Sequence, residues 1–399
     1  MTKPRMHSYC YSALDVLSRY DGSLPLHHLL KDVFRRNKKF GSRDRKWIRE
    51  LCYARFRSGT LFNNLSDEDA LLWSLYLASD EPSTVLSNIL ETGGPEFAAL
   101  DSTLSLLEKL KLAGVVNLES AAEKIFPFLG HVSDSLESVS FALAMLRQPD
   151  VWIRVRAGQL DTVTKLLDDQ GILYRRHSVI PLALALPPGI SLDGKGILES
   201  GLAEVQDLSS QRTIEFMQAE SGQRWLDACA ASGGKSLLLM DRVQGIDLTV
   251  SDNRVSVLKN LDERFKRNGI SKFSSVLRDW SQPALAVVND VEAYDGIIAD
   301  VPCSGSGTWA RTPEQQRYFT AEKITEYSSL QLAIVSNLIP ALKSGGHLVY
   351  ITCSVFIEEN EMQLNRFAEK LPVKVIRQEY LSGIDQQADT MFAALLQKL

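Results

Sequence analysis

The sequence predicts an α/β protein in which a doubly wound sheet is preceded by an all-α region and a small α/β unit. Three observations lead to this fold class. Apolar residues recur at helical spacing through residues 1–145, strand-like runs begin after Pro149, and strands alternate with helices from about residue 206 onward. We therefore expect three domains, at residues 1–145, 146–205 and 206–399.

The first region is helical and basic. Apolar side chains recur at three- and four-residue intervals between Leu26 and Phe34, and again between Ile48 and Phe56. Residues 1–60 hold 14 Lys and Arg against 5 Asp and Glu, a net charge of +9, which leaves −14 for the rest of a chain whose total is −5. This asymmetry indicates a local nucleic-acid contact, although a solvated helix surface explains the charge equally well.

The middle region reads as a small mixed unit. We expect strands at 151–156, 172–176 and 182–186, because apolar and β-branched residues alternate there between turn residues. A helical pattern at 160–167 lies between the first two strands and ends at Gly171.

In the third region strands and helices follow one another in turn. The expected strands are 224–230, 248–252, 273–279, 294–300 and 347–352, with two closing strand-like runs at 373–376 and 391–396. We expect four helices here: one that begins at Lys235, one at 254–268, one that follows Thr320, and one at 358–371. The third has Leu342 on its apolar face and is broken by Gly345-Gly346. This alternation predicts a doubly wound sheet with helices on both faces.

The composition excludes several classes of protein. There are five cysteines, without CxxC spacing and without a histidine cluster, so we expect reduced thiols and no metal site. No apolar run approaches the roughly 18 residues of a membrane span, and Asp15 and Arg19 interrupt any secretory apolar core. We expect a cytoplasmic protein without membrane contact, and a monomer because nothing requires a dimer.

Polar and sulfur-bearing residues stand where the expected strands of the third region end. In open α/β sheets, ligands bind beyond the carboxyl ends of the strands. The residues at these ends are Asp227, Cys229, Asp252, Asp279, Asp300, Cys303 and Cys353. Three of the five cysteines thus lie at strand ends beside small residues, which core packing alone does not explain.

Two glycine-containing loops suggest nucleotide sites, but neither fits. The run Ala231-Ser-Gly-Gly-Lys-Ser236 has Cys229 where a phosphate-binding loop requires glycine. The run Gly305-Ser-Gly-Thr-Trp-Ala310 follows the fourth strand rather than the first, and Pro313 interrupts any helix that would open there. Asp252, at the end of the second strand, suits the hydroxyl pair of a ribose, and it also suits a helix N-cap.

Three segments together resemble the Sun-type (NOL/NOP/Sun) family of RNA cytosine-5 methyltransferases. They are Leu226-Asp-Ala-Cys-Ala-Ala-Ser-Gly-Gly-Lys-Ser236, Asp300-Val-Pro-Cys-Ser-Gly-Ser-Gly-Thr308, and Tyr350-Ile-Thr-Cys-Ser354 with Glu358-Glu-Asn-Glu361. The resemblance covers about residues 206–399 and implies a Rossmann-like class I methyltransferase sheet. More loosely, residues 1–145 resemble the NusB-like RNA-binding domain of bacterial members that act on ribosomal RNA. The middle unit resembles the family's ferredoxin- or RRM-like insertion.

The resemblance implies a reaction in which a thiolate adds to carbon 6 of cytosine and makes carbon 5 nucleophilic. It implies that Cys353 is the nucleophile and that Cys303 assists breakdown of the adduct, with the two thiols flanking one base that has left its stack. Asp300 is then expected to bind the cytosine edge, and Lys235 to orient Asp300.

The same resemblance implies an S-adenosylmethionine site. Its expected residues are Cys229, Ala230, Ala231, Ser232, Gly233, Gly234, Lys235, Asp252, Asp279 and Asp300. The backbone of the loop would hold the methionine part, Asp252 the ribose and Asp279 the adenine edge. This chain departs from the family pattern at Ser232, at Val301 and in the segment 388–392, and none of these changes removes a reacting group.

Other functions stay open at this point. A non-catalytic RNA-binding or ribosome-assembly factor would keep the fold, although the two cysteines, Asp300 and Lys235 are intact. A DNA cytosine methyltransferase would need a long target-recognition insert, for which the span between Cys303 and Cys353 has no room. Ribosomal RNA is favoured over transfer RNA only through residues 1–145. Arg311 and Arg317 are equally compatible with phosphate contacts and with ordinary surface charge.

Overall fold

A computed structural model describes residues 3–79, 84–283 and 294–399. The chain divides into two compact units. The first comprises Met1–Gln148 with Thr308–Thr320, and the second comprises Pro149–Gly307 with Ala321–Leu399. We retain the three-part division at residues 145 and 205 as a proposal, alongside this observed division.

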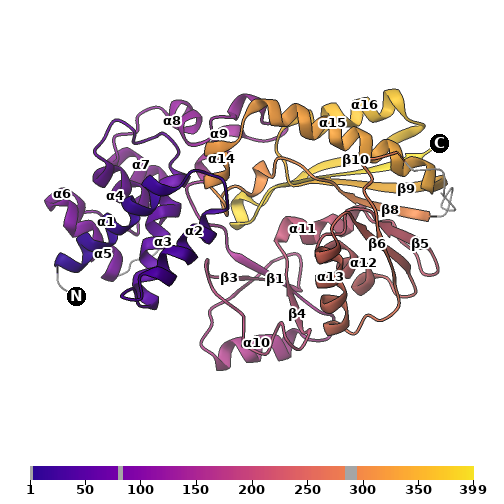
Figure 1. Ribbon diagram of the computed structural model, residues 1–399, viewed down its shortest axis with the longest axis horizontal. Helices are drawn as coiled ribbons and strands as arrows, with labels where there is room; N and C mark the ends of the chain where they lie inside the picture. Colours follow the sequence, from indigo (N-terminus) through magenta and orange to yellow (C-terminus); the bar gives the residue numbers. More distant parts are fainter. Residues whose placement is uncertain (1–2, 80–83, 284–293) are drawn as a thin grey trace. The chain divides into compact units, whose positions relative to one another are not determined.

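The first unit is made of helices. They are α1 (Lys3–Arg19), α2 (Leu26–Arg36), α3 (Ser42–Arg57), α4 (Asp67–Ala78), α5 (Thr84–Leu90), α6 (Pro95–Ala98), α7 (Leu106–Leu112), α8 (Leu118–Ile125), α9 (Ser138–Ala144) and α14 (Glu314–Tyr318) (Figure 1). Ser66 caps α4 by accepting a hydrogen bond from the N–H of Asp69, and three acidic residues in the first turn complement the helix dipole. The N-terminal helical region is therefore confirmed.

A segment of later sequence, residues 308–320, is part of this helical unit. Trp309 is only 1% exposed, with its ring centroid 5.6 Å from that of Phe126 and 5.1 Å from that of Phe319. Buried Arg57, at the end of α3, donates from Nε to the carbonyl oxygen of Ala310 at 3.0 Å. Aromatic packing and this hydrogen bond explain why the segment joins the helices rather than the sheet next to it in sequence.

The second unit begins with a four-stranded antiparallel sheet in the order β2-β3-β1-β4. Its elements are β1 (Val151–Val155), α10 (Leu160–Asp169), β2 (Arg175–Arg176), β3 (Ala183–Leu186) and β4 (Ala203–Val205). Val163 and Leu167 of α10 pack with Ile153 and Leu184 in a common core. Residues 187–202 form turns and bends, and the short strand β4 had no clear sequence signal. On the face away from α10, Leu208 of α11 (Leu208–Arg212) packs with Trp152, Ala183 and Ala185.

The main sheet has seven strands in the order β10-β11-β9-β8-β5-β6-β7. The strands are β5 (Arg224–Asp227), β6 (Asp247–Asp252), β7 (Ser274–Leu277), β8 (Tyr294–Asp300), β9 (Leu342–Thr352), β10 (Val373–Leu381) and β11 (Met391–Lys398). The five strands β5 to β9 are parallel, and β11 is antiparallel to both neighbours. The chain order reverses between β5 and β8, which creates a topological switch point there.

Helices cover both faces of this sheet (Figure 1). On one face, α15 (Ala321–Leu338) and α16 (Glu361–Lys370) pack against side chains that include Ile297 of β8. On the other face, α12 (Gly234–Arg242) and α13 (Val255–Arg267) pack against side chains that include Ile298. Adjacent residues of β8 are thus buried on opposite faces, as expected for a central parallel strand. The predicted doubly wound α/β fold is confirmed.

The boundary between α15 and β9 differs from the prediction. The helix ends at Leu338, and a short 3-10 turn through Pro340 follows it, because proline removes a backbone donor. Leu342, expected on the helix face, is therefore the first residue of β9. Gly345 and Gly346 lie within the strand at a register shift of its pairing with β8, where glycine's conformational freedom permits an irregular pairing.

Candidate active site

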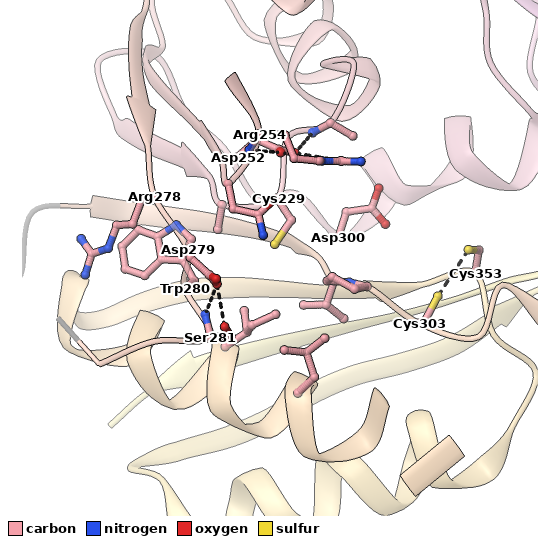
Figure 2. A pocket seen from close by; sticks show the side chains of 17 residues that line it. Cys229, Asp252, Arg254, Arg278, Asp279, Trp280, Ser281, Asp300, Cys303 and Cys353 are labelled. Carbon is pink, nitrogen blue, oxygen red and sulfur yellow. Dashed lines mark hydrogen bonds and ion pairs between the residues drawn. The ribbon is translucent and has the colours of Figure 1, made fainter. Parts of the chain in front are cut away.

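A cavity of about 540 Å³ lies at the carboxyl ends of β5, β6, β8 and β9, at the switch point of the sheet. We call it the strand-end cavity. Its lining residues are Ala228, Cys229, Ala231, Asp252, Asn253, Arg254, Arg278, Asp279, Trp280, Ser281, Asp300, Val301, Pro302, Cys303, Leu330, Ile334 and Cys353. In the view of Figure 2, Trp280 and Arg278 lie toward one end and the two thiols toward the other, with Asp300 between them.

The loop after β5 makes a tight turn that reaches this cavity. Ala231 has a φ of 45°, a left-handed conformation that is uncommon for a residue with a Cβ. Gly233 has a φ of 81°, and a Cβ there would lie 2.6 Å from the ring of Phe265. Only glycine therefore allows α12 to begin this close to α13.

The six loop residues predicted to bind a cofactor divide into two groups. Cys229 and Ala231 line the strand-end cavity. The other four are absent from its lining: Ala230 is buried, Gly233 and Gly234 open α12, and Ser232 accepts hydrogen bonds from Nη1 of Arg264 at 2.8 and 3.0 Å. The side chain at position 232 thus faces away from the cavity, so its departure from the family pattern leaves the lining unchanged.

Asp252, the last residue of β6, uses its carboxylate fully. Its oxygens accept hydrogen bonds from the N–H of Ala231 at 3.2 Å and from the N–H of Arg254 at 3.0 Å. The guanidinium of Arg254 also pairs with it, with Nε 3.1 Å from Oδ1 and Nη2 3.3 Å from Oδ2. A carboxylate has about four lone-pair sites, so a further donor can bind Asp252 only if Arg254 withdraws. The Arg254 side chain is 61% exposed, so it has room to move.

Asp279 and Trp280 follow β7 and line the cavity together. Oδ1 of Asp279 accepts hydrogen bonds from the hydroxyl of Ser281 at 2.6 Å and from its N–H at 2.9 Å, and these bonds lower the pKa of Asp279. The indole N–H of Trp280 donates to Ser251 at 2.8 Å, which fixes the ring. The Arg278 guanidinium lies 3.5 Å from the centre of that ring.

Asp300 and Lys235 form an ion pair beside the cavity. Nζ of Lys235 lies 2.8 Å from Oδ2 of Asp300. Burial alone would lower the pKa of Lys235, but the ion pair with Asp300 outweighs burial and raises it. Lys235 therefore stays a cation at neutral pH. Asp300 lines the cavity and Lys235 does not, so of this pair it is the carboxylate that reaches the cavity.

Cys303 and Cys353 bring their sulfur atoms within 3.3 Å of each other (Figure 2). The contact with Cys353, together with burial, raises the pKa of the Cys303 thiol well above its usual value. A base stacked between the sulfurs would hold them roughly 7 Å apart. The two sulfur atoms would therefore have to separate before a base could lie between them.

Other groups around the cavity had weaker sequence signals. Arg254, Arg278 and Trp280 lie just beyond the ends of strands. The only feature of the sequence that could have indicated them is a basic or aromatic residue shortly after an expected strand. Leu330 and Ile334 lie one turn apart on α15 and line the cavity. The apolar spacing that predicted a buried face of this helix could also have indicated that part of that face lines the site.

Two further properties concern the described parts of the chain only. Among residues 3–79, 84–283 and 294–399, no group of three or more His, Cys, Asp or Glu side chains is arranged to hold a metal ion. Within the same residues, no helix combines the length and apolar character needed to cross a bilayer.

Known proteins similar to this chain act on RNA or share its fold. Residues 214–395 match the model of a family described as 16S rRNA methyltransferase RsmB/F. Ribosomal RNA small subunit methyltransferase B of Salmonella arizonae is 30% identical over 263 residues, which are 63% of this chain and 61% of that protein. The Xylella fastidiosa protein of the same name is 32% identical over 62% of this chain and 57% of its own length. The match thus spans less than two thirds of these relatives.

Solved structures show the same fold at low sequence identity. The crystal structure of PH0851 has a TM-score of 0.74 and 19% identity, covering 100% of this chain and 99% of that one. NSun6 from Pyrococcus horikoshii with SFG has a TM-score of 0.58 and 18% identity, covering 68% of this chain and 97% of that one.

Proposed function

We propose, from the match of residues 214–395 to the family described as 16S rRNA methyltransferase RsmB/F, that the protein belongs to this family and transfers a methyl group from S-adenosylmethionine to carbon 5 of a cytosine in ribosomal RNA. The proposal depends above all on one observation. Two thiols in contact at 3.3 Å lie at the same cavity as Asp300, whose carboxylate is paired with Lys235.

The strand-end cavity suits the proposed cofactor chemically. Asp252 and Asp279 offer carboxylate acceptors for a ribose diol and an adenine amino group, and the fixed indole of Trp280 offers an apolar wall. The loop at Cys229 and Ala231 would hold the amino-acid part. When bound, this cofactor supplies an electrophilic methyl group.

Cys353 is the proposed nucleophile. Its thiolate would form a bond to carbon 6 of the cytosine, which makes carbon 5 electron-rich and able to accept the methyl group. A base, which solvent can supply, then takes the carbon 5 proton. The electrons of that C–H bond restore the double bond between carbons 5 and 6, and the bond from sulfur to carbon 6 breaks, which regenerates Cys353 as a thiolate. Asp300 would hold the ring-nitrogen edge of the base while charge develops there, and Lys235 would keep that carboxylate in position.

Cys303 has a different proposed role from Cys353. Its pKa is raised by the contact with Cys353 and by burial, so it keeps its proton at neutral pH. A protonated thiol beside the nucleophile can carry a proton during breakdown of the adduct, but it is a poor nucleophile itself.

The helical unit supports an RNA substrate. Between α2 and α3 it carries exposed basic side chains, which suit a phosphate backbone. Ribosomal RNA remains the proposed substrate, with transfer RNA as the alternative. We also propose that the protein acts in the cytoplasm, because a nucleophilic thiol next to a second thiol needs a reducing compartment. We propose that it acts as a monomer.

Adduct trapping tests the proposal. The wild-type protein and its Cys303→Ser and Cys353→Ser variants would be incubated with the cofactor and either unmodified ribosomal RNA or transfer RNA. We expect Cys303→Ser to accumulate a protein–RNA band on denaturing gels, because the adduct forms but its breakdown is slow. Cys353→Ser and the double variant should give neither band nor methylation.

The outcomes separate the alternatives. Methylation retained in Cys353→Ser and lost in Cys303→Ser would reverse the two roles and match a DNA-type mechanism. Cofactor binding without methylation of either RNA, by the wild-type protein, would contradict the enzyme and favour a non-catalytic RNA-binding factor. Bisulfite sequencing of the methylated RNA would identify the base.

A further inference from the structure

A single buried carboxylate joins the two loops that carry the thiols. Glu359 is 0% exposed and lies at the end of a 3-10 turn, Ile357–Glu359. Its Oε2 accepts a hydrogen bond from the N–H of Ser304 at 2.9 Å, and its Oε1 accepts one from the hydroxyl of Ser354 at 2.7 Å. Ser304 follows Cys303 and Ser354 follows Cys353 in sequence. The residue that follows each cysteine in sequence therefore binds the same carboxylate.

The loop of Cys303 is held on both sides of the thiol. Before it, the carbonyl oxygen of Pro302 accepts a hydrogen bond from Nε2 of Gln331 at 3.1 Å, and after it, the N–H of Ser304 binds Glu359. The same Nε2 of Gln331 donates to Oε2 of Glu359 at 2.9 Å. Gln331 lies on α15, so this arrangement fastens the loop to a helix that covers the sheet.

The loop of Cys353 is held in a similar way by the residue after Glu359. Oδ1 of Asn360 accepts a hydrogen bond from the hydroxyl of Thr352 at 2.6 Å, and its Nδ2 donates to the carbonyl oxygen of Ser354 at 2.9 Å. The two loops also meet directly, since the hydroxyls of Ser304 and Ser354 lie 3.0 Å apart. Two groups of the network bind the residue after each cysteine: the carboxylate of Glu359, and the hydroxyl of Ser306, which lies 3.1 Å from that of Ser304 and 3.2 Å from that of Ser354.

A carboxylate in this position has a cost. Burial raises the pKa of Glu359, and the hydrogen bonds from Ser304, Ser354 and Gln331 act in the opposite direction. Removing such a group from water is unfavourable unless donors replace the water, and here three do so. Apolar side chains of similar volume in place of such a buried polar network often stabilise a fold equally well or better. The network is therefore better explained as fixing one arrangement of the two loops than as stabilising the fold in general.

We infer that Glu359 is a positioning residue that joins the two cysteine loops and holds the thiols of Cys303 and Cys353 in contact. The consequence for catalysis rests on the proposed function. Reactive groups held within contact distance need no reorganisation before they act, and a displacement of about 1 Å can cost roughly a hundredfold in rate.

The cross-linking rate of the two thiols tests this inference without RNA or cofactor. Diamide oxidises two neighbouring thiols to a disulfide and takes up their two electrons and two protons. Mass spectrometry of digested protein would follow the peptide pair that contains Cys303 and Cys353. We expect Glu359→Ala to slow this reaction about tenfold or more, because the loops lose their shared acceptor and separate.

Two further variants make the result specific. Glu359→Gln keeps an oxygen for Ser304 and can donate to the Ser354 hydroxyl, so we expect a rate within about threefold of the wild type, since these hydrogen bonds are largely retained. Glu204→Ala is the matched control, because that carboxylate is also buried and accepts hydrogen bonds from Arg264 and Asn268, which belong to neither cysteine loop. Circular dichroism and the melting temperature would establish that each variant is folded.

The inference is overturned if folded Glu359→Ala cross-links as fast as the wild type, or if Glu359→Gln is as slow as Glu359→Ala. Failure of the proposed methyl transfer would leave both rates unaffected. The two proposals therefore fail separately.

Discussion

Lys235, the second residue of α12, lies 2.8 Å from the carboxylate of Asp300, the last residue of β8. The helix begins immediately after the loop at the cavity, and the strand ends there, so the switch point of the sheet brings the two together. The pair places a fixed cation behind the carboxylate that is proposed to face the substrate base.

Replacement of Lys235 by Met should abolish most methylation while leaving RNA binding intact. Met has a similar length but no charge, so Asp300 loses its partner and its fixed orientation. We expect kcat to fall about a hundredfold and KM for RNA to change little, because the lost interaction serves the reacting base. Lys266→Met is the control, since Lys266 forms an exposed ion pair with Asp262. Normal turnover by folded Lys235→Met would show that the pair is only structural.

Replacement of Arg254 by Ala should not weaken binding of S-adenosylmethionine, whereas Asp252→Ala should weaken it about tenfold, the value of one net hydrogen bond to a charged group. The reason is that Arg254 occupies lone pairs of Asp252 that a ribose would use. Isothermal titration calorimetry would measure both dissociation constants. Equal weakening by the two substitutions would instead mean that Arg254 itself binds the cofactor.

Because of Asp227, we expect the folded protein to lose stability as pH rises toward neutrality. Burial raises the pKa of Asp227 to about 7, from a value of 3.8 without the fold. The folded protein thus favours the protonated form, so its extra stability is complete below pH 4 and is lost between pH 4 and 7. The difference in unfolding free energy is at most about 4 kcal/mol.

Chemical denaturation of Asp227→Asn between pH 4 and 9 would check this prediction. The neutral amide cannot ionise, so the variant should gain stability relative to the wild type as pH rises. The hydroxyl of Ser236, which donates to Asp227 at 2.6 Å, can donate to the amide oxygen as well. A constant difference across this pH range would exclude ionisation of Asp227 as the cause.

The basic surface between α2 and α3 should contribute salt-sensitive RNA affinity. Four exposed basic residues, in the loop between α2 and α3 and in the first turns of α3, form no ion pair within the described residues: Lys38, Lys39, Arg43 and Lys46. Their combined substitution by Ala should reduce the slope of log affinity against log salt by roughly three, as expected for up to four lost phosphate contacts. Filter binding at several salt concentrations would measure the slope.

A variant with four exposed lysines of the second unit changed to Ala gives the matched control for this measurement. Those lysines are Lys259, Lys272, Lys370 and Lys374. An equal loss of slope in both variants would mean that the basic surface has no special part in RNA binding.

Local patterns in the sequence were sufficient for the sheet and for the side of it that carries the site. Alternating strands and helices predict parallel strands, and parallel strands place their carboxyl ends at one edge. Asp252, Asp279, Asp300, Cys303 and Cys353 therefore line one cavity, as their positions after the strands indicated. The end of α15 was harder to predict. Pro340 marks it, but the apolar spacing of the helix continues past the residue at which the backbone leaves the helix.

Contacts between segments far apart in sequence appeared only in the folded structure. The 3.3 Å separation of the thiols, the bonds of Glu359 to both cysteine loops and the burial of Trp309 among the helices each join residues that no local pattern connects. The sequence determined which residues stand at the ends of the strands, because side-chain periodicity is a local property of the backbone. Tertiary packing alone decided which of them touch, because those distances depend on strand order and on the side chains that fill the space between the elements.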